Sequence, residues 1–372
     1  MKLLISTGLF YPSKLGGPAN TLYWLGKGLV SKGVIVSVVS LYKYIDDDRI
    51  SPDKWTIIDN IKTLYCTATT KLAQNVILQS IKQIKKNEVL LLSSFHFMPC
   101  FFVALYASLL KKRIIWSPRG ELFDSAINKN KFKKIYIRFI KLFFTKSVIF
   151  HATSNEEKEK LQYYLGKNIK TVIIPNYMEL PEKEERNANE KYLLYVGRIA
   201  PIKALDNLIK GLMKSEKFIK SEYKFFLAGY TAGEYYESLL KIISENNLSE
   251  KIIFLGNVEG REKNTLYANA CFSFLVSHSE NFGNVVVESL AQGTPVVASK
   301  GTPWQMLNEI NSGYWIENNV ESIAKCVNVI LQLDNENYEA MRENAFNCCQ
   351  EHFDVYKNID KWLNIINPKV NV

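Results

Sequence analysis

The chain has 372 residues, of which 47% are hydrophobic and 23% are charged. These fractions are close to those of ordinary folded domains, so they exclude intrinsically disordered, collagen-like and coiled-coil proteins. At roughly 150 residues per domain, the length predicts two domains. No stretch reaches the roughly 18 consecutive apolar residues of a membrane-spanning helix, so we expect no integral membrane segment.

The formal net charge of +10 is unevenly distributed. Residues 1–180 contain 27 Lys and Arg but 12 Asp and Glu, whereas the remaining residues contain 20 and 25. The basic excess therefore belongs to the N-terminal half, which is a candidate for contact with an anionic partner. The six cysteines form no C-x-x-C pair, so we expect no zinc or thioredoxin-like site and a reduced, cytosolic chain.

Short apolar runs alternate with stretches of helical period, which predicts an α/β fold with parallel sheets built from β-α units. In the first half, strands are expected at residues 2–6, 35–40, 56–65 in part, 89–92, 113–116, 147–152 and 171–175, and helices at 20–32 and 73–86. After Pro175 the chain becomes hydrophilic, and residues 181–191 have no apolar period. We therefore assign residues 1–180 to a first domain.

A second series of strands is expected at residues 192–196, 224–228, 251–255, 272–275 and 295–298, with helices at 204–212, 234–246, 261–268 and 285–292. These elements predict a second domain over residues 181–350. The tail is helical in pattern, and we expect residues 351–372 to return to the first domain. Two such domains would face each other across a cleft at the carboxyl ends of their strands, where open α/β sheets bind ligands.

A glycine pair, Gly16-Gly17, follows the first predicted strand and precedes a helix expected to begin near Asn20. Such a pair lets backbone N–H groups approach an anion at a helix N-terminus. A plain turn is an equally good interpretation of these glycines alone. The spacing is not G-x-G-x-x-G, which argues against a nicotinamide dinucleotide enzyme.

The second domain opens with VGRIAPIK, which places Arg198 just beyond a strand and Lys203 ahead of a helix. Two fixed cations facing a cleft suit a diphosphate, because a departing nucleotide needs its charge neutralised. Without other context, two solvated surface cations would be the simpler interpretation.

The segment SENFGNVVVE places Glu280 in a loop and Glu288 about one turn into the following helix, with a tight turn between them formed by Asn281, Phe282, Gly283 and Asn284. This spacing places one carboxylate in the loop and the other on the helix, and the open helix N-terminus between them can face an anion such as phosphate. Taken alone, the same residues are also typical of a helix-capping acid and a solvated helix residue.

Two further candidates lie at predicted strand ends, His96 and Arg119. Active sites of α/β proteins gather at such ends. His151, within an apolar run, is expected to be a core histidine with satisfied hydrogen bonds. The run 46–48 of three aspartates has no partner ligands in a polar loop, so a solvated turn is expected there and not a metal site.

Residues 129–146 contain seven Lys and Arg and no acidic residue. Apolar side chains recur between these cations at three- and four-residue spacing and predict a basic amphipathic helix; they are Phe132, Ile135, Phe139, Leu142 and Phe143. Such a helix can lie in an anionic membrane interface. It can equally be an ordinary helix with its apolar stripe in the core. Nucleic acid, the other usual partner of a basic face, is not expected because no nucleic-acid-binding signature is present.

Taken together, these motifs resemble the retaining GT-B glycosyltransferases of family 4. The matching segments, which span nearly the whole chain, are the Gly16-Gly17 loop, SPRGE at 117–121, HATSNEEK at 151–158, IPN at 174–176, VGRIAPIK at 196–203 and the E-x7-E pair Glu280 and Glu288. The resemblance implies two facing Rossmann-like domains and a metal-independent transfer without a cofactor. The donor would be a nucleoside diphosphate sugar, with UDP or GDP expected.

By this resemblance, Glu280 contacts hydroxyls of the donor sugar and Glu288 binds the ribose. Residues 281–284 meet the sugar and phosphates, and Arg198 and Lys203 neutralise the departing diphosphate. Gly16 and Gly17 would bring the first domain onto that diphosphate. The base is expected near Gly229 and residues 257–260. Several family members carry His-Gly where this chain has Arg119-Gly120, so His96 is an alternative to Arg119 for the catalytic histidine role.

In this family the first domain receives the acceptor. The basic half and the helix at 129–146 then predict a lipid-linked saccharide acceptor and a cytoplasmic enzyme held peripherally at the inner face of the membrane. The pathway implied is bacterial surface-polysaccharide assembly: O-antigen of lipopolysaccharide, capsule or exopolysaccharide. Alternatives are a GT-B nucleotide-sugar epimerase, a sucrose-type synthase with a soluble acceptor, or an inactive nucleotide-sugar-binding scaffold.

Overall fold

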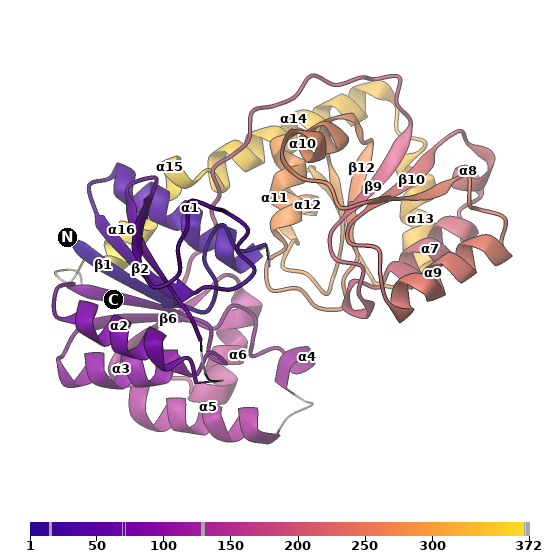
Figure 1. The fold of residues 1–372 in the computed structure, drawn as a ribbon. Coiled ribbons are helices and arrows are strands. Elements are labelled where there is room, and N and C mark those ends of the chain that lie inside the picture. Colours follow the sequence, from indigo (N-terminus) through magenta and orange to yellow (C-terminus); the bar gives the residue numbers. More distant parts are fainter. Residues whose placement is uncertain (15–16, 69, 71, 128–130, 368, 370–372) are drawn as a thin grey trace. The chain divides into compact units, whose positions relative to one another are not determined.

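The chain forms two compact units in a computed structural model that describes residues 1–14, 17–68, 70, 72–127, 131–367 and 369 (Figure 1). Unit 1 comprises Met1–Glu179 and Asp354–Val372, and unit 2 comprises Leu180–Phe353. The first division is one residue from the position assigned from the sequence. The second lies at 353/354 and not at 350/351, because the long helix α14 (Asn335–His352) continues to that point.

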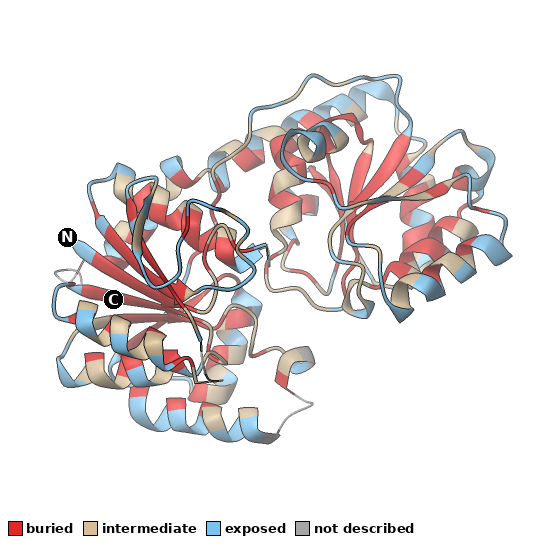
Figure 2. Ribbon diagram, viewed as in Figure 1, coloured by how far each residue is buried: buried red, intermediate tan, exposed pale blue. Residues whose placement is uncertain are grey.

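The described strands of unit 1 form one sheet in the order β3-β4-β2-β1-β5-β6-β7-β8. In chain order they are β1 (Lys2–Thr7), β2 (Ile35–Leu41), β3 (Trp55–Ile58), β4 (Ile61–Cys66), β5 (Val89–Ser93), β6 (Arg113–Ser117), β7 (Val148–Ala152) and β8 (Thr171–Ile173). All neighbours pair in parallel except β3 and β4, which are antiparallel. The central strands are buried on both faces, as Figure 2 shows, so they appear in the sequence as continuous apolar runs.

The antiparallel pair β3 and β4 at the sheet edge differs from the prediction, which expected one strand within residues 56–65. That segment is a hairpin of two strands, turned by Asp59 and Asn60 with φ of 47° and 63°. Asp and Asn tolerate this left-handed region, and two such residues in succession make the tight turn that suits twisted hairpins. The turn signal was present in the sequence.

Two hydrophobic cores lie on opposite faces of this sheet. Alternate residues of β5 contribute to each: Leu90 and Leu92 to one core, Val89 and Leu91 to the other. The helices of unit 1 are α1 (Gly17–Ser31), α2 (Gln74–Ile84), α3 (Pro99–Leu109), α4 (Asp124–Ile127), α5 (Lys131–Phe144), α6 (Asn155–Leu165), α15 (Val355–Asn358) and α16 (Asp360–Ile366). Helix α15 packs on α1, and residues of α15 and α16 complete the second of these cores, so the tail returns to the first unit as expected.

Unit 2 has a described sheet in the order β11-β10-β9-β12-β13-β14, with all neighbours parallel. Its strands are β9 (Tyr192–Val196), β10 (Lys224–Ala228), β11 (Ile252–Gly256), β12 (Phe272–Leu275), β13 (Val296–Ser299) and β14 (Gly313–Ile316). Besides α14, its helices are α7 (Leu205–Lys214), α8 (Glu216–Lys220), α9 (Glu234–Glu245), α10 (Gly260–Asn269), α11 (Asn284–Ala291), α12 (Met306–Glu309) and α13 (Val320–Ile330). The predicted α/β class, with two Rossmann-like units, is confirmed.

Two predicted helix starts need correction. Helix α1 begins at Gly17 and not near Asn20, because Pro18 has the backbone angle of a first helical turn and needs no N–H partner there. The helix expected at 204–212 begins at Leu205, preceded by a 3₁₀ turn, Pro201–Lys203, and by Ala204 at φ 51°. Within the described residues, no helix is long and apolar enough to cross a membrane.

Helix α5 presents an apolar stripe to solvent. Phe132 is 80% exposed and Leu142 is 74% exposed, and the other predicted stripe residues, Ile135, Phe139 and Phe143, are exposed as well. The core side of the helix is formed instead by Ile137, Ile140 and Phe144. The interpretation of this segment as an ordinary helix with that stripe in the core is therefore wrong; residues 129 and 130 lie outside the described residues.

Candidate functional site

The candidate residues of unit 2 come from the carboxyl ends of four neighbouring strands. Arg198 follows β9, Gly229 follows β10, residues 257–260 follow β11, and residues 280–284 follow β12. The chain winds from β9 toward one edge of the sheet and from β12 toward the other, so the order reverses between these two strands. Open α/β sheets bind ligands at the carboxyl side of such a reversal.

The backbone is tightly packed where β9 and β10 end. The N–H of Gly197 donates to the Ala228 carbonyl at 2.9 Å, and the Tyr195 hydroxyl donates to the Arg198 carbonyl at 2.8 Å. A Cβ on Gly229 would lie 2.0 Å from the Gly197 carbonyl oxygen. Because glycine has no Cβ, Gly229 lets its backbone approach that of Gly197 closely. This contact fixes the backbone just before Arg198.

Lys203 and Glu280 form an ion pair at the reversal point. The Lys203 ammonium contacts Glu280 Oε2, and the two side chains are only 13% and 19% exposed. The 3₁₀ turn holds Lys203, while the Glu280 N–H donates to the Gly301 carbonyl at 2.9 Å. The contact brings together two residues that are 77 positions apart in the sequence.

The turn between the two glutamates has the form that the sequence predicts. Gly283, at φ 83°, precedes α11, and Asn284 is the first residue of that helix. The Phe282 ring is buried against Trp304, with ring centres 5.2 Å apart, and the Trp304 indole N–H donates to the Phe282 carbonyl. Asn281 lies between Glu280 and this anchored ring. The turn is thus held by packing behind the helix N-terminus.

Glu288 lies one turn into α11, as predicted, and meets two side chains of α10. Its Oε1 pairs with the Lys263 ammonium at 3.0 Å, and its Oε2 accepts from the Tyr267 hydroxyl at 3.5 Å. Burial and the neighbouring carboxylate hold the pKa of Tyr267 well above its usual value, so its hydroxyl stays protonated. Lys263 was not identified from the sequence, although its four-residue spacing from Tyr267 puts both on one helix face.

Unit 1 gathers its candidates at the carboxyl ends of three adjacent strands. Gly17 follows β1 as the first residue of α1, His96 follows β5, and Arg119 follows β6. The strand order reverses between β1 and β5, so this edge is also the ligand-binding side of an open sheet. Gly16 lies outside the described residues.

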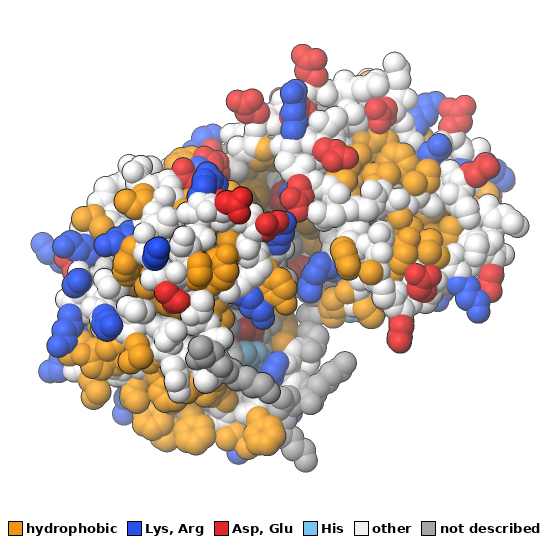
Figure 3. Space-filling model, in the orientation of Figure 1, with side chains coloured by type: hydrophobic (Ala, Val, Ile, Leu, Met, Phe, Trp, Pro, Cys, Tyr) orange, Lys and Arg blue, Asp and Glu red, His pale blue; other side chains and the backbone are white. Residues whose placement is uncertain are grey.

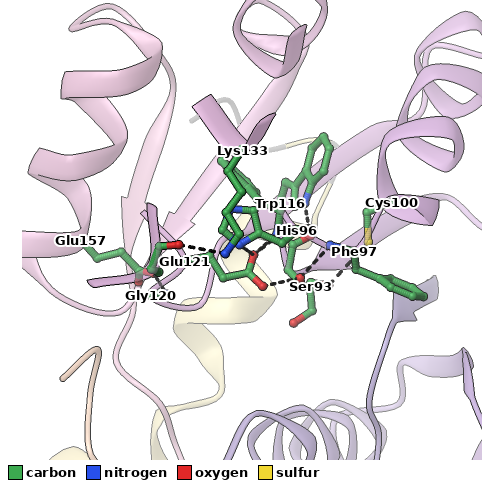
Figure 4. A network of polar contacts seen from close by, with 12 residues as sticks. Ser93, His96, Phe97, Cys100, Trp116, Gly120, Glu121, Lys133 and Glu157 are labelled. Carbon is green, nitrogen blue, oxygen red and sulfur yellow. Dashed lines mark hydrogen bonds and ion pairs between the residues drawn. The ribbon is translucent and has the colours of Figure 1, made fainter. Parts of the chain in front are cut away.

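The loop that carries His96 is held by Glu121 (Figure 4). The Glu121 carboxylate accepts hydrogen bonds from Ser94 Oγ at 2.6 Å and from the His96 N–H at 2.8 Å. Burial, and to a smaller extent the charge of Lys133, lowers the pKa of His96 to about 4. At neutral pH the imidazole is therefore uncharged, and the 3.9 Å contact between His96 Nδ1 and Glu121 is not an ion pair. His96 Nε2 is buried and has no hydrogen-bond partner among the described residues.

The loop that carries Arg119 is held by a second glutamate, Glu157, which is buried. Its carboxylate accepts from the N–H groups of Gly120 and Thr153, at 2.5 and 2.8 Å. Arg119 donates to Asn176 Oδ1 at 2.9 Å, and burial lowers the pKa of its guanidinium to about 10. The guanidinium is thus charged at neutral pH and lies inside the unit. No pattern in the sequence indicates the role of Glu157.

The two remaining sequence candidates are His151 and the aspartate run at 46–48. His151 is fully buried, with Nδ1 2.9 Å from Ser117 Oγ and Nε2 2.8 Å from the Ile174 carbonyl, which confirms a satisfied core histidine. Asp46 pairs with Lys14 on the surface at 2.7 Å. In the part of the chain that the structure describes, no group of three or more His, Cys, Asp or Glu is placed to hold a metal ion.

Comparison with known families identifies the C-terminal part of the chain. Residues 176–347 match the family described as Glycosyl transferases group 1. This segment is therefore similar to glycosyltransferase group 1 domains. It contains every candidate of unit 2, including the Lys203–Glu280 and Lys263–Glu288 pairs, whereas His96 and Arg119 lie outside it.

Individual relatives support the same assignment. An uncharacterized glycosyltransferase of Methanocaldococcus jannaschii is 31% identical over 186 residues, which cover 50% of this chain and 45% of that protein. An uncharacterized 41.2 kDa protein in the cps region of Klebsiella pneumoniae is 25% identical over 333 residues, covering 82% of this chain and 88% of that protein. The first match thus spans less than half of its relative's length.

Solved structures with the same fold extend over both units. HepE of Anabaena, in complex with UDP, matches with a TM-score of 0.76 at 17% identity over 98% of each chain. At this identity the likeness shows the fold alone, which is GT-B: two Rossmann-like α/β units, the second carrying the segment that matches the group 1 family.

Proposed function

We propose that this protein is a retaining glycosyltransferase that moves a sugar from a nucleoside diphosphate sugar to a saccharide acceptor. The observation that carries the proposal is the Lys203–Glu280 pair at the strand reversal of a glycosyltransferase group 1 domain. In this proposal unit 2 binds the donor, and unit 1 receives the acceptor near His96. The complex of HepE with UDP is consistent with a nucleotide donor.

The charges of unit 2 suit the proposed leaving group. Lys203 is already compensated by Glu280, so a bound diphosphate would share the ammonium while Glu280 turns its free lone pairs to sugar hydroxyls. Arg198, on a backbone fixed by Gly197, supplies the second cation. Fixed cations aimed at the diphosphate stabilise the charge that develops as the glycosidic bond breaks, which is usually the largest contribution to such catalysis. No metal ion is needed for this role.

Retention would follow from attack on the face that the leaving group occupies. The bond between the anomeric carbon and the diphosphate oxygen breaks, the acceptor oxygen forms the new bond on the same face, and the acceptor proton passes to the departing phosphate. The enzyme's contribution is then orientation and charge stabilisation. The imidazole of His96, uncharged at neutral pH, would help to orient the acceptor hydroxyl.

We place the reaction in surface-polysaccharide assembly, with a lipid-linked acceptor. The support is the Klebsiella relative, which belongs to a cps region and matches over most of both chains.

Nucleotide binding is the first test of this function. Purified protein is heated with UDP, GDP, ADP and their sugars, each with and without Mg²⁺ or Mn²⁺. A ligand at 100 times its dissociation constant adds about 2.7 kcal/mol to the free energy of unfolding, so we expect one nucleotide family to raise the melting temperature by several degrees, equally with and without metal.

The alternatives give different results. Stabilisation only in the presence of metal would contradict the metal-independent mechanism, and no stabilisation by any nucleotide would contradict donor binding. Release of the nucleotide from its sugar should then require a saccharide acceptor. Release or isomerisation without acceptor would indicate an epimerase, and binding without turnover on any acceptor would indicate a scaffold.

We also propose that unit 1 docks on an anionic membrane through α5. Hydrophobic side chains gather on this part of the surface in Figure 3, and the exposed stripe is bordered on one side by exposed Lys134, Arg138 and Lys141. An apolar stripe beside a row of cations is the arrangement of helices that lie in a membrane interface. Such docking would bring the acceptor-binding unit to a lipid-linked substrate.

Charge reversal tests this docking. Each cation near an anionic surface contributes about 1 kcal/mol, so the triple change of Lys134, Arg138 and Lys141 to Glu should lower partitioning onto phosphatidylglycerol vesicles by about 100-fold or more. Lys133 is left unchanged because its ammonium donates to the Ala126 carbonyl. In the control, exposed Lys210, Lys220 and Lys241 are changed to Glu, with the same change in net charge. If both triple variants lose vesicle binding equally, the effect comes from net charge and not from α5. If the α5 variant binds vesicles as well as the wild type does, α5 has only a structural role.

A further inference from the structure

The carboxylate of Glu288 is held from one side by a single helix. Lys263 and Tyr267 lie four residues apart on α10, so they share the face that packs on α11. One engages each oxygen: Lys263 Nζ lies 3.0 Å from Oε1, and the Tyr267 hydroxyl lies 3.5 Å from Oε2. The carboxylate can therefore neither rotate nor swing away without losing a partner.

Lys263 and Tyr267 together form a clamp on the Glu288 carboxylate, and this clamp is largely shielded from water. The Lys263 and Glu288 side chains are 26% and 15% exposed, and Tyr267 is fully buried. At such a site the lysine charge offsets much of the cost of burying the carboxylate. A carboxylate has about four acceptor positions, and the two partners from α10 occupy two of them. The described residues make no other hydrogen bond to this carboxylate, which leaves the other two positions for hydroxyl groups of a ligand.

We propose that Lys263 and Tyr267 are positioning residues that fix Glu288 to read the two adjacent hydroxyls of the donor's ribose, and so let unit 2 select ribonucleotides over 2′-deoxyribonucleotides. This inference rests on the proposed function, in which Glu288 binds the ribose. A site built to bond a hydroxyl rejects the analogue that lacks it, because its buried polar group is then left unpaired. Rejection requires that the carboxylate cannot move to find another partner, and this is what the clamp provides.

Isothermal titration calorimetry with the full chain tests the inference. The probe is whichever of UDP, GDP or ADP stabilises the protein most, together with its 2′-deoxy analogue. We expect the wild type to prefer the ribonucleotide by about tenfold or more. In Lys263→Met the ribonucleotide affinity should fall about tenfold while the deoxy affinity changes little, so that the preference is nearly lost.

Three further variants separate positioning from general disruption. Lys263→Arg keeps the charge and a donor and should restore most of the preference, and Tyr267→Phe should reduce it in part. Lys241→Met removes an exposed lysine that pairs with Glu245 at 3.8 Å on α9, and should leave both affinities unchanged.

Each remaining outcome is decisive. A wild-type preference that persists in Lys263→Met would overturn the inference while donor binding stands. If Lys263→Met lowers the affinity for the ribonucleotide and for its deoxy analogue equally, and Lys263→Arg does not restore these affinities, then Lys263 has only a structural role. This result would also overturn the inference. If the wild type binds none of the three ribonucleotides, the proposed function fails and the inference fails with it.

Discussion

Glu280→Gln should lower turnover by at least about 100-fold, with little change in nucleotide affinity. Glutamine keeps the size of the side chain but removes the charge that balances Lys203 and that, in the proposed function, accepts donor-sugar hydroxyls. Loss of one preorganised electrostatic contact in an active site typically costs two to three orders of magnitude in kcat. The amide oxygen still accepts from Lys203, but the nearly buried ammonium loses its counter-charge, so the free energy of unfolding should fall by about 1–3 kcal/mol. Steady-state release of nucleotide in the presence of acceptor measures the effect.

Glu317→Gln is the matched control for this variant. Glu317 also pairs with a lysine, Lys300, at 2.7 Å, but its side chain is 58% exposed. Exposed ion pairs contribute little to the free energy of unfolding, so Glu317→Gln should keep both activity and stability near the wild-type values. Near-normal turnover in Glu280→Gln would remove Glu280 from the catalytic site.

Gly229→Ala should destabilise unit 2 by more than about 3 kcal/mol. The added Cβ would lie 2.0 Å from the Gly197 carbonyl oxygen and 3.1 Å from its carbonyl carbon, and backbone cannot yield as a flexible side chain does. Any relief must move the segment that ends β9, so Arg198 should be displaced and the donor bound more weakly. Urea unfolding and nucleotide titration measure the two effects.

A second glycine separates this collision from the general effect of losing a glycine. Gly256 has φ 78°, and a Cβ there would meet nothing within 4 Å. Gly256→Ala should therefore cost only the strain of a left-handed alanine, about 1–2 kcal/mol. If Gly229→Ala and Gly256→Ala lower the free energy of unfolding by similar amounts, the approach of Gly229 to Gly197 is not under steric constraint.

The sequence predicts the frame of the candidate site in unit 2 well, because that frame depends on local pattern. Arg198, Lys203 and Glu280 each follow an apolar run that forms a strand, and parallel strands present their carboxyl ends at one edge. The tight turn at Gly283 also follows from its residue types. The pairing of Lys203 with Glu280 needs the strand order, which no local pattern contains.

The residues that the sequence does not reveal act through packing between helices or between loops. Lys263 reaches Glu288 only because α10 packs on α11, and a lysine in a polar helix looks solvated. Glu157 is likewise buried within a helix of low apolar content, where it holds the N–H of Gly120. The side of α5 that faces the core could not be chosen either, because two apolar faces share one helix and only the tertiary structure selects Ile140 over Phe139.

The return of residues 354–366 to unit 1 affects the order in which the chain can fold. Trp362, Ile365 and Ile366 belong to the same core as Leu3 and Ile5 of the first strand, so that core stays incomplete until residue 366 has been synthesised. Unit 2 is one continuous segment and can close first, although it is synthesised later. During synthesis the apolar surface under α16 is open for the longest time. A fragment cut after Glu179 would keep that surface exposed, so unit 1 is better expressed alone with the 354–366 segment joined to it by a linker.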